Sequence, residues 1–309
     1  MKNTEITFCL RNPCNYSCNY CIGKGFHNPL IFHDMNKLSE IYQSIKPFIS
    51  TVFECGTGEP TIHPQIKEIL SLCGLYGAVS MPTNNSQDPE KWLSKEYARV
   101  LYLNITVHPQ AEKKLENFLD RLIRIKEMGA TISLQYVARP DRIKRFLNLK
   151  EYFCNKGFSL TGMPYTGFFN GVEYPYSYLE EEKKSFGITE STYWLHRMGI
   201  DTKIRNFEGI PCLAGSSSFC IGPETTLKRC IYDETLLDTP YKEAQPCRVS
   251  NCGCGLLLKE LNHQTSRYWN DLRALGGYPL LETEDKDDNQ LYQEAYQKYQ
   301  ELMKSYNKI

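Results

Sequence analysis

Apolar and polar residues alternate in two periods through the first half of the chain, and these periods define its predicted elements. Apolar residues at every second position are typical of strands, and apolar residues three or four positions apart are typical of helices. The predicted strands cover residues 5–10, 51–55, 78–81, 100–107, 131–137 and 158–161. The predicted helices lie between them, around residues 38–45, 66–73, 90–98, 115–128 and 141–154.

Strand and helix therefore alternate about six times, which implies parallel strands joined by helical crossovers. Six units are too few for a closed eight-stranded barrel. The sequence predicts an α/β fold with an open, partial (β/α)6 barrel. Its ligand is expected at the carboxyl ends of the strands.

The second half of the chain has a different pattern. Residues 164–206 are rich in Tyr, Phe and Gly without a clear period, and we expect a bridging segment that contributes substrate contacts. Residues 218–221 and 226–230 read as a hairpin. A helix with a tyrosine-rich face is predicted near the C-terminus. The predicted domains are residues 1–163 (barrel), 164–206 (bridge), 207–260 (cysteine-rich domain) and 261–309 (helical segment).

Composition narrows the classes of function. The 309 residues carry a formal net charge of zero, which gives no electrostatic footprint for nucleic acid or an anionic membrane. No apolar run has the length of a membrane span, and the first residues lack the apolar core of a signal peptide. We therefore expect a cytoplasmic protein with neither a nucleic-acid nor a membrane partner.

The cysteines point to metal. There are 13 of them, and without an export signal a disulfide scaffold is not expected. Their clustering in residues 14–21 and 212–254 favours metal binding in a reducing compartment. Cys9, Cys73 and Cys154 lie in apolar or helical surroundings and are read as ordinary buried thiols.

The first cluster has the spacing Cys14-x3-Cys18-x2-Cys21. Three thiolates this close converge only around something small and multivalent, and a cubane iron–sulfur cluster fits. Three ligands leave one iron open, which usually indicates chemistry rather than structure. Zinc is the alternative, but it usually takes four closed ligands, and only His27 offers itself nearby.

This loop resembles the signature of the radical S-adenosylmethionine (SAM) superfamily, in which Tyr20 matches an aromatic position before the third cysteine. The resemblance implies a 4Fe-4S cluster on Cys14, Cys18 and Cys21 whose open iron chelates SAM. Reduction then cleaves SAM to methionine and a 5′-deoxyadenosyl radical. It also implies an external one-electron reductant of the flavodoxin or ferredoxin type.

A second motif follows the second predicted strand. Gly56-Thr57-Gly58-Glu59-Pro60 resembles the Gly-Gly-Glu-Pro turn that holds the SAM amino group in the family, with Thr57 as a departure. Asn84 matches the Asn of a Thr-Asn-Gly turn, with Asn85 in place of the glycine. The residues that the resemblance assigns to SAM binding are Tyr20, Gly58, Glu59, Asn84, Thr106 and Gln135. Asn84, Thr106 and Gln135 could equally be ordinary polar residues at strand ends.

The second cysteine group resembles the auxiliary-cluster domain of the family, called SPASM in its two-cluster form and twitch in its one-cluster form. Cys212 and Cys230 flank the predicted hairpin as in that domain, but Thr225 stands where glycine is frequent. The thiols suffice for one auxiliary 4Fe-4S cluster. Its predicted ligands are Cys212, Cys230 and two of Cys247, Cys252 and Cys254. Zinc is the alternative metal.

Cys220 lies between Cys212 and Cys230 and is left over by this assignment. It is read as a buried thiol, as a further cluster ligand, or as a hydrogen-atom donor to a substrate radical, a role that a cysteine has in peptide epimerases of the family.

The resemblance implies an oxidoreductase or isomerase in which the radical abstracts hydrogen from a substrate carbon. Relatives with auxiliary clusters mostly modify peptides by epimerisation, crosslinking or oxidation, so a peptide substrate is expected. A small molecule such as a sugar or aminocyclitol is the alternative. A cluster-bearing electron carrier or a zinc protein is the rival from another class.

Overall fold

The computed structural model describes residues 4–21, 29–45, 49–54, 58–188, 208–209 and 211–249. Its largest sheet has the strand order β12-β11-β10-β1-β2-β3-β4-β5-β6. The strands that follow one another from the N-terminus pair in parallel. They are β1 (Thr4–Phe8), β2 (Ile49–Phe53), β3 (Val79–Thr83), β4 (Leu101–Thr106), β5 (Thr131–Ala138) and β6 (Leu160–Pro164).

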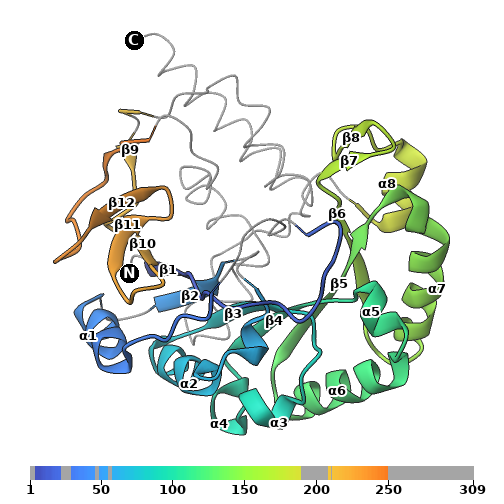
Figure 1. The fold of residues 1–309 in the computed structure, drawn as a ribbon, viewed down its shortest axis with the longest axis horizontal. Coiled ribbons are helices and arrows are strands. Elements are labelled where there is room, and N and C mark those ends of the chain that lie inside the picture. Colours follow the sequence, from blue (N-terminus) through green and yellow to red (C-terminus); the bar gives the residue numbers. More distant parts are fainter. Residues whose placement is uncertain are drawn as a thin grey trace, which may run out of the picture.

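Helices follow these strands along the chain and cover the outer face of the curved sheet (Figure 1). They are α1 (Met35–Ile45), α2 (Ile66–Tyr76), α3 (Pro89–Trp92), α4 (Lys95–Ala98), α5 (Pro109–Glu112), α6 (Leu115–Glu127), α7 (Ile143–Cys154) and α8 (Glu180–Phe186). Two short 3₁₀ turns, η1 (Pro60–Ile62) and η2 (Pro140–Arg142), precede α2 and α7. The predicted α/β fold with a partial (β/α)6 barrel is confirmed.

The hydrophobic core lies between the sheet and these helices. On α1 the apolar positions of the helical period are buried, Leu38 and Tyr42 completely, and Ile6 and Phe8 of β1 are equally buried. Burial of each such side chain contributes about 1.5–3 kcal/mol, so packing rather than helix propensity holds these short helices. Among the described helices, none has the length and apolar character needed to cross a membrane.

The sequence predicted one helix over residues 90–98, and the structure corrects this. Leu93 is extended, with φ −108° and ψ 144°, and separates α3 from α4. The side chains of Asp88 and Ser94 each accept a hydrogen bond from a backbone N–H at the start of the following helix. Ser94 therefore begins a new helix, because a serine cap satisfies an N–H group that a continuous helix would bond internally.

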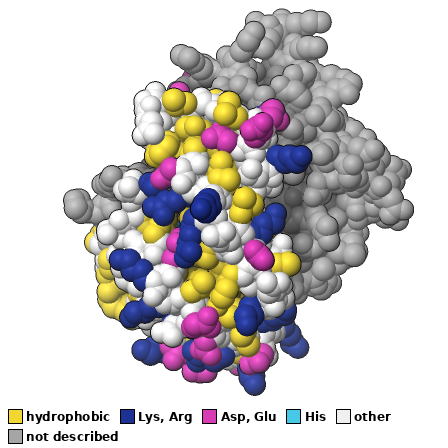
Figure 2. All heavy atoms as spheres, turned by 90° about the vertical axis from the view of Figure 1, so that its right-hand side faces the viewer, with side chains coloured by type: hydrophobic (Ala, Val, Ile, Leu, Met, Phe, Trp, Pro, Cys, Tyr) yellow, Lys and Arg dark blue, Asp and Glu magenta, His cyan; other side chains and the backbone are white. Residues whose placement is uncertain are grey.

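The predicted bridging segment contains elements that its irregular pattern did not reveal. A small hairpin of β7 (Gly167–Phe169) and β8 (Val172–Tyr174) precedes α8. Phe168 is 70% exposed and Leu179 is 66% exposed. Figure 2 shows the face that carries this hairpin and the neighbouring helices, where hydrophobic and charged side chains are intermixed.

The cysteine-rich segment forms β9 (Pro211–Cys212), β10 (Ser218–Ile221), β11 (Leu227–Cys230), β12 (Asp233–Leu236) and β13 (Gln245–Pro246). β10 and β11 are the predicted hairpin, which is confirmed. β10 also pairs in parallel with β1, from Glu5 beside Ser218 to Phe8 beside Ile221. The hairpin thus continues the sheet of the barrel, which the sequence pattern did not show. The bounds of the four predicted domains remain predictions, and the predicted C-terminal helix lies outside the described residues.

Thr225 lies in the turn between β10 and β11, and its side chain contacts the segment before α1. Its φ of 55° lies in the left-handed region, which suits the glycine expected at this position. Its Oγ1 accepts a hydrogen bond from the backbone N of Asp34 at 3.0 Å and lies 3.2 Å from Nδ1 of His33. A β-branched residue is strained in this region, and these two contacts hold it there.

Candidate functional site

The three cysteines of the first cluster lie in a loop that follows β1 directly. The loop turns tightly at its end, where the backbone N of Cys21 donates to the carbonyl of Cys18 at 3.2 Å. The thiols of Cys14 and Cys21 are exposed and that of Cys18 is half-buried. The loop therefore presents three thiols at the carboxyl end of the first parallel strand, which is where the fold predicts a ligand.

Burial raises the pKa of Cys14 and of Cys18 above the ordinary thiol value, and the neighbouring thiols raise it further. The thiols of both Cys21 and Cys14 raise the pKa of Cys18, so the three cysteines lie close enough to interact electrostatically. Within the described ranges, no three His, Cys, Asp or Glu side chains are set to hold a single metal ion. Three clustered thiols suit the donor set of a multinuclear iron–sulfur group.

His108, which the sequence analysis missed, packs against this loop from the end of β4. Its Nδ1 lies 3.3 Å from Sγ of Cys18 and 3.0 Å from the hydroxyl of Tyr20. The rings of Tyr20 and His108 are stacked, with centroids 6.0 Å apart. Burial lowers the pKa of His108 to about 4, so the imidazole is neutral at physiological pH. The available signal was a polar residue at a strand end, followed by the helix-starting Pro109.

The turn after β2 lies directly against the start of the cysteine loop. Gly58 has φ +115°, and a Cβ atom on it would lie 1.9 Å from the carbonyl oxygen of Asn12. The side-chain amide of Asn12 donates to the carbonyl of Glu59, and the backbone N of Glu59 donates to the carbonyl of Pro13 at 3.3 Å. Only glycine allows this approach, so the two motifs are joined backbone to backbone.

The carboxylate of Glu59 is buried and accepts four hydrogen bonds. Its Oε1 accepts from the backbone N of Thr61 at 3.1 Å and from the hydroxyls of Thr61 and Thr83, both at 2.6 Å. Its Oε2 accepts from the backbone N of Asn84 at 2.7 Å. Burial raises the pKa of Glu59, while the four donors act in the opposite direction. Glu59 thus ties the end of β2 to the end of β3.

Asn84 and Asn85 form the turn that Glu59 fixes. The amide of Asn84 donates to Oδ1 of Asn15 at 3.0 Å and lies 3.9 Å from the sulfur of Cys14. Asn85 has φ 52°, a left-handed conformation that asparagine adopts more readily than most residues. The departure from glycine at residue 85 therefore keeps the turn, and the structure brings Asn84 to the cysteine loop.

Thr106 and Gln135 lie side by side on β4 and β5. Both are half-buried. Nε2 of Gln135 lies 3.4 Å from Oδ1 of Asn104, and the amide of Asn104 donates to the hydroxyl of Ser80 at 3.1 Å. Polar side chains therefore form a ladder across β3, β4 and β5, on the face opposite the buried Leu103 and Ile105. Their assignment to SAM remains a prediction.

Cys9 and Cys220 are both buried, as was predicted for Cys9. Cys73 is also buried as predicted, but Cys154 is exposed, so the prediction of a buried thiol at that position was wrong. The sulfur atoms of Cys9 and Cys220 lie 3.4 Å apart. Thr7 pairs with Cys220 in the register of β1 and β10, and Cys9 follows on the same face of the sheet. The hydrogen bond between the two thiols, together with burial, raises the pKa of Cys9 far above its ordinary value.

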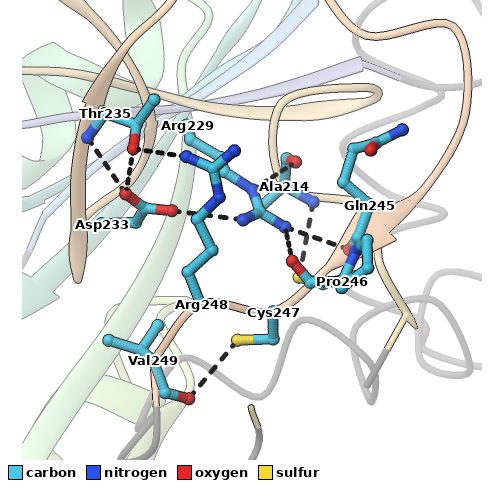
Figure 3. Close-up of polar contacts among 10 residues, drawn as sticks. Ala214, Arg229, Asp233, Thr235, Gln245, Pro246, Cys247, Arg248 and Val249 are labelled. Atoms are coloured by element: carbon cyan, nitrogen blue, oxygen red, sulfur yellow. Dashed lines mark hydrogen bonds and ion pairs between the residues drawn. The ribbon is translucent and has the colours of Figure 1, made fainter. Parts of the chain in front are cut away.

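Three predicted ligands of the auxiliary metal belong to the described residues. Cys212 and Cys230 both pack against Ala214, and Cys230 and Cys247 are each 8% exposed. In the pairing of β9 with β13, Cys212 lies opposite Gln245, which is two residues before Cys247 in the chain. Figure 3 shows Cys247, whose Sγ lies 3.6 Å from the carbonyl oxygen of Val249. Cys252 and Cys254 lie outside the described residues, so the choice among the later cysteines remains open.

Comparison with known proteins gives a distant likeness of fold. No protein-family model and no curated protein matches the chain. Among solved structures, Streptococcus suis SuiB bound to precursor peptide SuiA is similar at 12% identity and a TM-score of 0.48, over 74% of this chain and 60% of SuiB. Tagged anSMEcpe with bound AdoMet is similar at 14% identity and a TM-score of 0.49, over 96% of both chains. Native anSMEcpe with bound AdoMet and Cp18Cys peptide is similar at 14% identity and a TM-score of 0.47, over 99% of this chain and 100% of the other.

Proposed function

We propose that this protein is a radical SAM enzyme, which reductively cleaves S-adenosylmethionine and abstracts a hydrogen atom from a substrate carbon. One observation carries the proposal. The three-cysteine loop after β1 and the Gly58–Glu59 turn after β2 are in backbone contact at the carboxyl edge of a parallel sheet. Neither motif is specific alone, but an electron carrier or a zinc protein has no need of the second one beside the first.

The residues present fit the cofactors. Cys14, Cys18 and Cys21 would hold a 4Fe-4S cluster and leave one iron for SAM. When bound, the two groups supply the 5′-deoxyadenosyl radical. Glu59 uses both carboxylate oxygens on donors of the protein. We therefore assign to it the positioning of the Asn84 turn, while backbone groups of the Gly58 turn are left to meet SAM.

The substrate is proposed from the resemblance of the Cys212–Cys254 segment to auxiliary-cluster domains. A peptide is the favoured substrate, with epimerisation, crosslinking or oxidation as the outcome. A small molecule such as a sugar or aminocyclitol is the alternative. One auxiliary 4Fe-4S cluster and an external one-electron reductant complete the proposal. The exposed thiols of Cys14 and Cys21 lie on the edge of the sheet where a substrate would have to arrive.

Anaerobic incubation of the iron- and sulfide-reconstituted protein with SAM and dithionite tests this function. We expect release of 5′-deoxyadenosine and methionine. Replacing Cys14, Cys18 and Cys21 together with Ala should remove roughly half of the iron and all SAM cleavage. Cys154→Ala is the matched control, because this thiol is exposed at the end of α7 on the outer face. SAM cleavage by the triple variant would refute the assignment.

A further inference from the structure

Arg229 is a buried cation at the centre of the cysteine-rich segment. It lies on β11 and is 2% exposed. Its Nε donates to the carbonyl of Ala214 at 3.2 Å, and its Nη2 donates to the carbonyls of Gln245 at 3.0 Å and Pro246 at 2.7 Å (Figure 3). Its Nη1 meets Oδ2 of Asp233 at 3.2 Å. One guanidinium thus bonds to three separate stretches of chain.

Each of these stretches carries or adjoins a cysteine. Ala214 lies two residues after Cys212, Pro246 directly precedes Cys247, and Asp233 lies three residues after Cys230, which directly follows Arg229. The planar guanidinium offers its donors in fixed directions. The three carbonyls are therefore held in fixed positions, and with them the backbone that carries the three thiols.

Asp233 compensates the buried positive charge of Arg229. Its side chain is 9% exposed, and its Oδ1 accepts from the backbone N of Thr235 at 3.0 Å and from the Thr235 hydroxyl at 2.6 Å. Burial would raise the pKa of Asp233, but these bonds and the charge of Arg229 hold it below its ordinary value. A buried pair satisfied in this way is costly to break, because the remaining partner is left charged and unpaired.

We propose that Arg229 is the positioning residue of the auxiliary metal site: it fixes the backbone that carries Cys212, Cys230 and Cys247 before metal arrives, while the three side chains, among the described residues, are not themselves set around a single metal ion. This inference rests on the proposed function only for the identity of the metal group. Its physical basis is preorganisation, since ligands held in place by neighbouring groups bind metal more tightly. Arg229 also directly precedes the predicted ligand Cys230 in the chain, and net charge near a cluster sets its reduction potential.

The test uses the full chain with Cys14, Cys18 and Cys21 replaced by Ala, so that iron reports on the auxiliary site. In this parent, Arg229→Met should lower the affinity for the metal about 10- to 100-fold. In metal-free protein the same change should raise the alkylation rate of Cys212, Cys230 and Cys247 severalfold, as located by mass spectrometry. Arg248→Met is the matched control, because Arg248 is exposed and bonds only to Thr235 among the described contacts.

Asp233→Asn provides a readout that a merely structural role would not move. It leaves the carbonyl acceptors of Arg229 in place but removes the compensating negative charge. The reduction potential of the auxiliary cluster, titrated by electron paramagnetic resonance, should rise. Arg229→Lys, which keeps the charge without the fork of donors, should lose metal affinity while the potential of the remaining cluster stays near that of the parent.

The outcomes separate this inference from the proposed function. Zinc without iron in the parent would refute the auxiliary 4Fe-4S cluster, and the alkylation rates would still decide the role of Arg229. Iron content and alkylation in Arg229→Met equal to those of Arg248→Met would overturn the inference. If Arg229→Met does not fold, Arg229→Lys and Asp233→Asn decide. Full metal affinity in Arg229→Lys, together with an unchanged reduction potential in Asp233→Asn, would overturn the inference.

Discussion

The thiols of Cys9 and Cys220 lie 3.4 Å apart, although 211 positions separate the two residues in the chain. The parallel pairing of β1 with β10 creates this contact. The hydrogen bond between the thiols and their burial raise the pKa of Cys9, so this thiol stays protonated at neutral pH. A protonated thiol is a poor nucleophile and a poor metal ligand, but its S–H bond can still give a hydrogen atom to a carbon radical.

A substitution at Cys220 tests which reaction the protein performs. If Cys220 is the hydrogen-atom donor of an epimerase, Cys220→Ala should keep SAM cleavage and the auxiliary metal but lose the inverted product. The wild-type product should take up deuterium at one carbon in heavy water, without net loss of mass. Cys154→Ala should change nothing, because that thiol is exposed at the end of α7. A product lighter by two hydrogen atoms would indicate dehydrogenation or crosslinking and end the donor hypothesis.

The contact between the two cofactor motifs predicts a severe effect for Gly58→Ala. The new methyl group would lie 1.9 Å from the carbonyl oxygen of Asn12. We expect a loss of about 3 kcal/mol or more in the free energy of unfolding, together with loss of SAM cleavage. Gly157→Ala is the control, because Gly157 also has positive φ but has nothing within 4 Å. That change should cost about 1 kcal/mol. Equal urea midpoints for the two variants would contradict the assigned contact.

Glu59 predicts a measurable dependence of stability on pH. Burial raises its pKa in the folded protein above the ordinary value of 4.5. A raised carboxyl pKa means that the folded state binds the proton more tightly, so this contribution to stability is present at low pH. It is lost as the pH rises through the folded pKa. The unfolding free energy of wild type minus that of Glu59→Gln should therefore fall as the pH rises above 4.5. A difference that grows with pH would show that the four donors outweigh burial.

Thr225 predicts an unusual ranking of substitutions. Thr225→Val keeps the strained left-handed backbone and loses the hydroxyl contacts to His33 and Asp34, so it should cost about 1–3 kcal/mol. Thr225→Gly loses the same contacts but removes the strain, which is of order 1–3 kcal/mol. Glycine should therefore be the milder change, which urea denaturation of the metal-free protein can measure. A valine variant as stable as the glycine variant would contradict the backbone strain assigned to this position.

The sequence predicted the barrel well because the strands and helices of α/β units carry strong local periods. It failed at one local feature, the cap at Ser94, and otherwise where long-range contacts decide. Ser94 divides a predicted helix through a local cap, whereas the placement of His108 beside Cys18 depends on neighbouring strands. The parallel pairing of β10 with β1 left no local signal, because a strand of four residues that is buried throughout carries no alternation to specify its partner. Arg229 read as an ordinary hairpin residue, since its acceptors are backbone carbonyls with no signature in the sequence.

The pairing of β1 with β10 has a consequence for the order of synthesis. β1 leaves the ribosome first, yet its outer edge is covered only by residues 218–221. Until those residues emerge, the nascent chain presents an unpaired strand edge, which is a template for association with other chains. Contacts of such high sequence separation also slow folding. Emergence of residues 218–221, rather than completion of the first 160 residues, is therefore the step at which this edge of the barrel is protected from association.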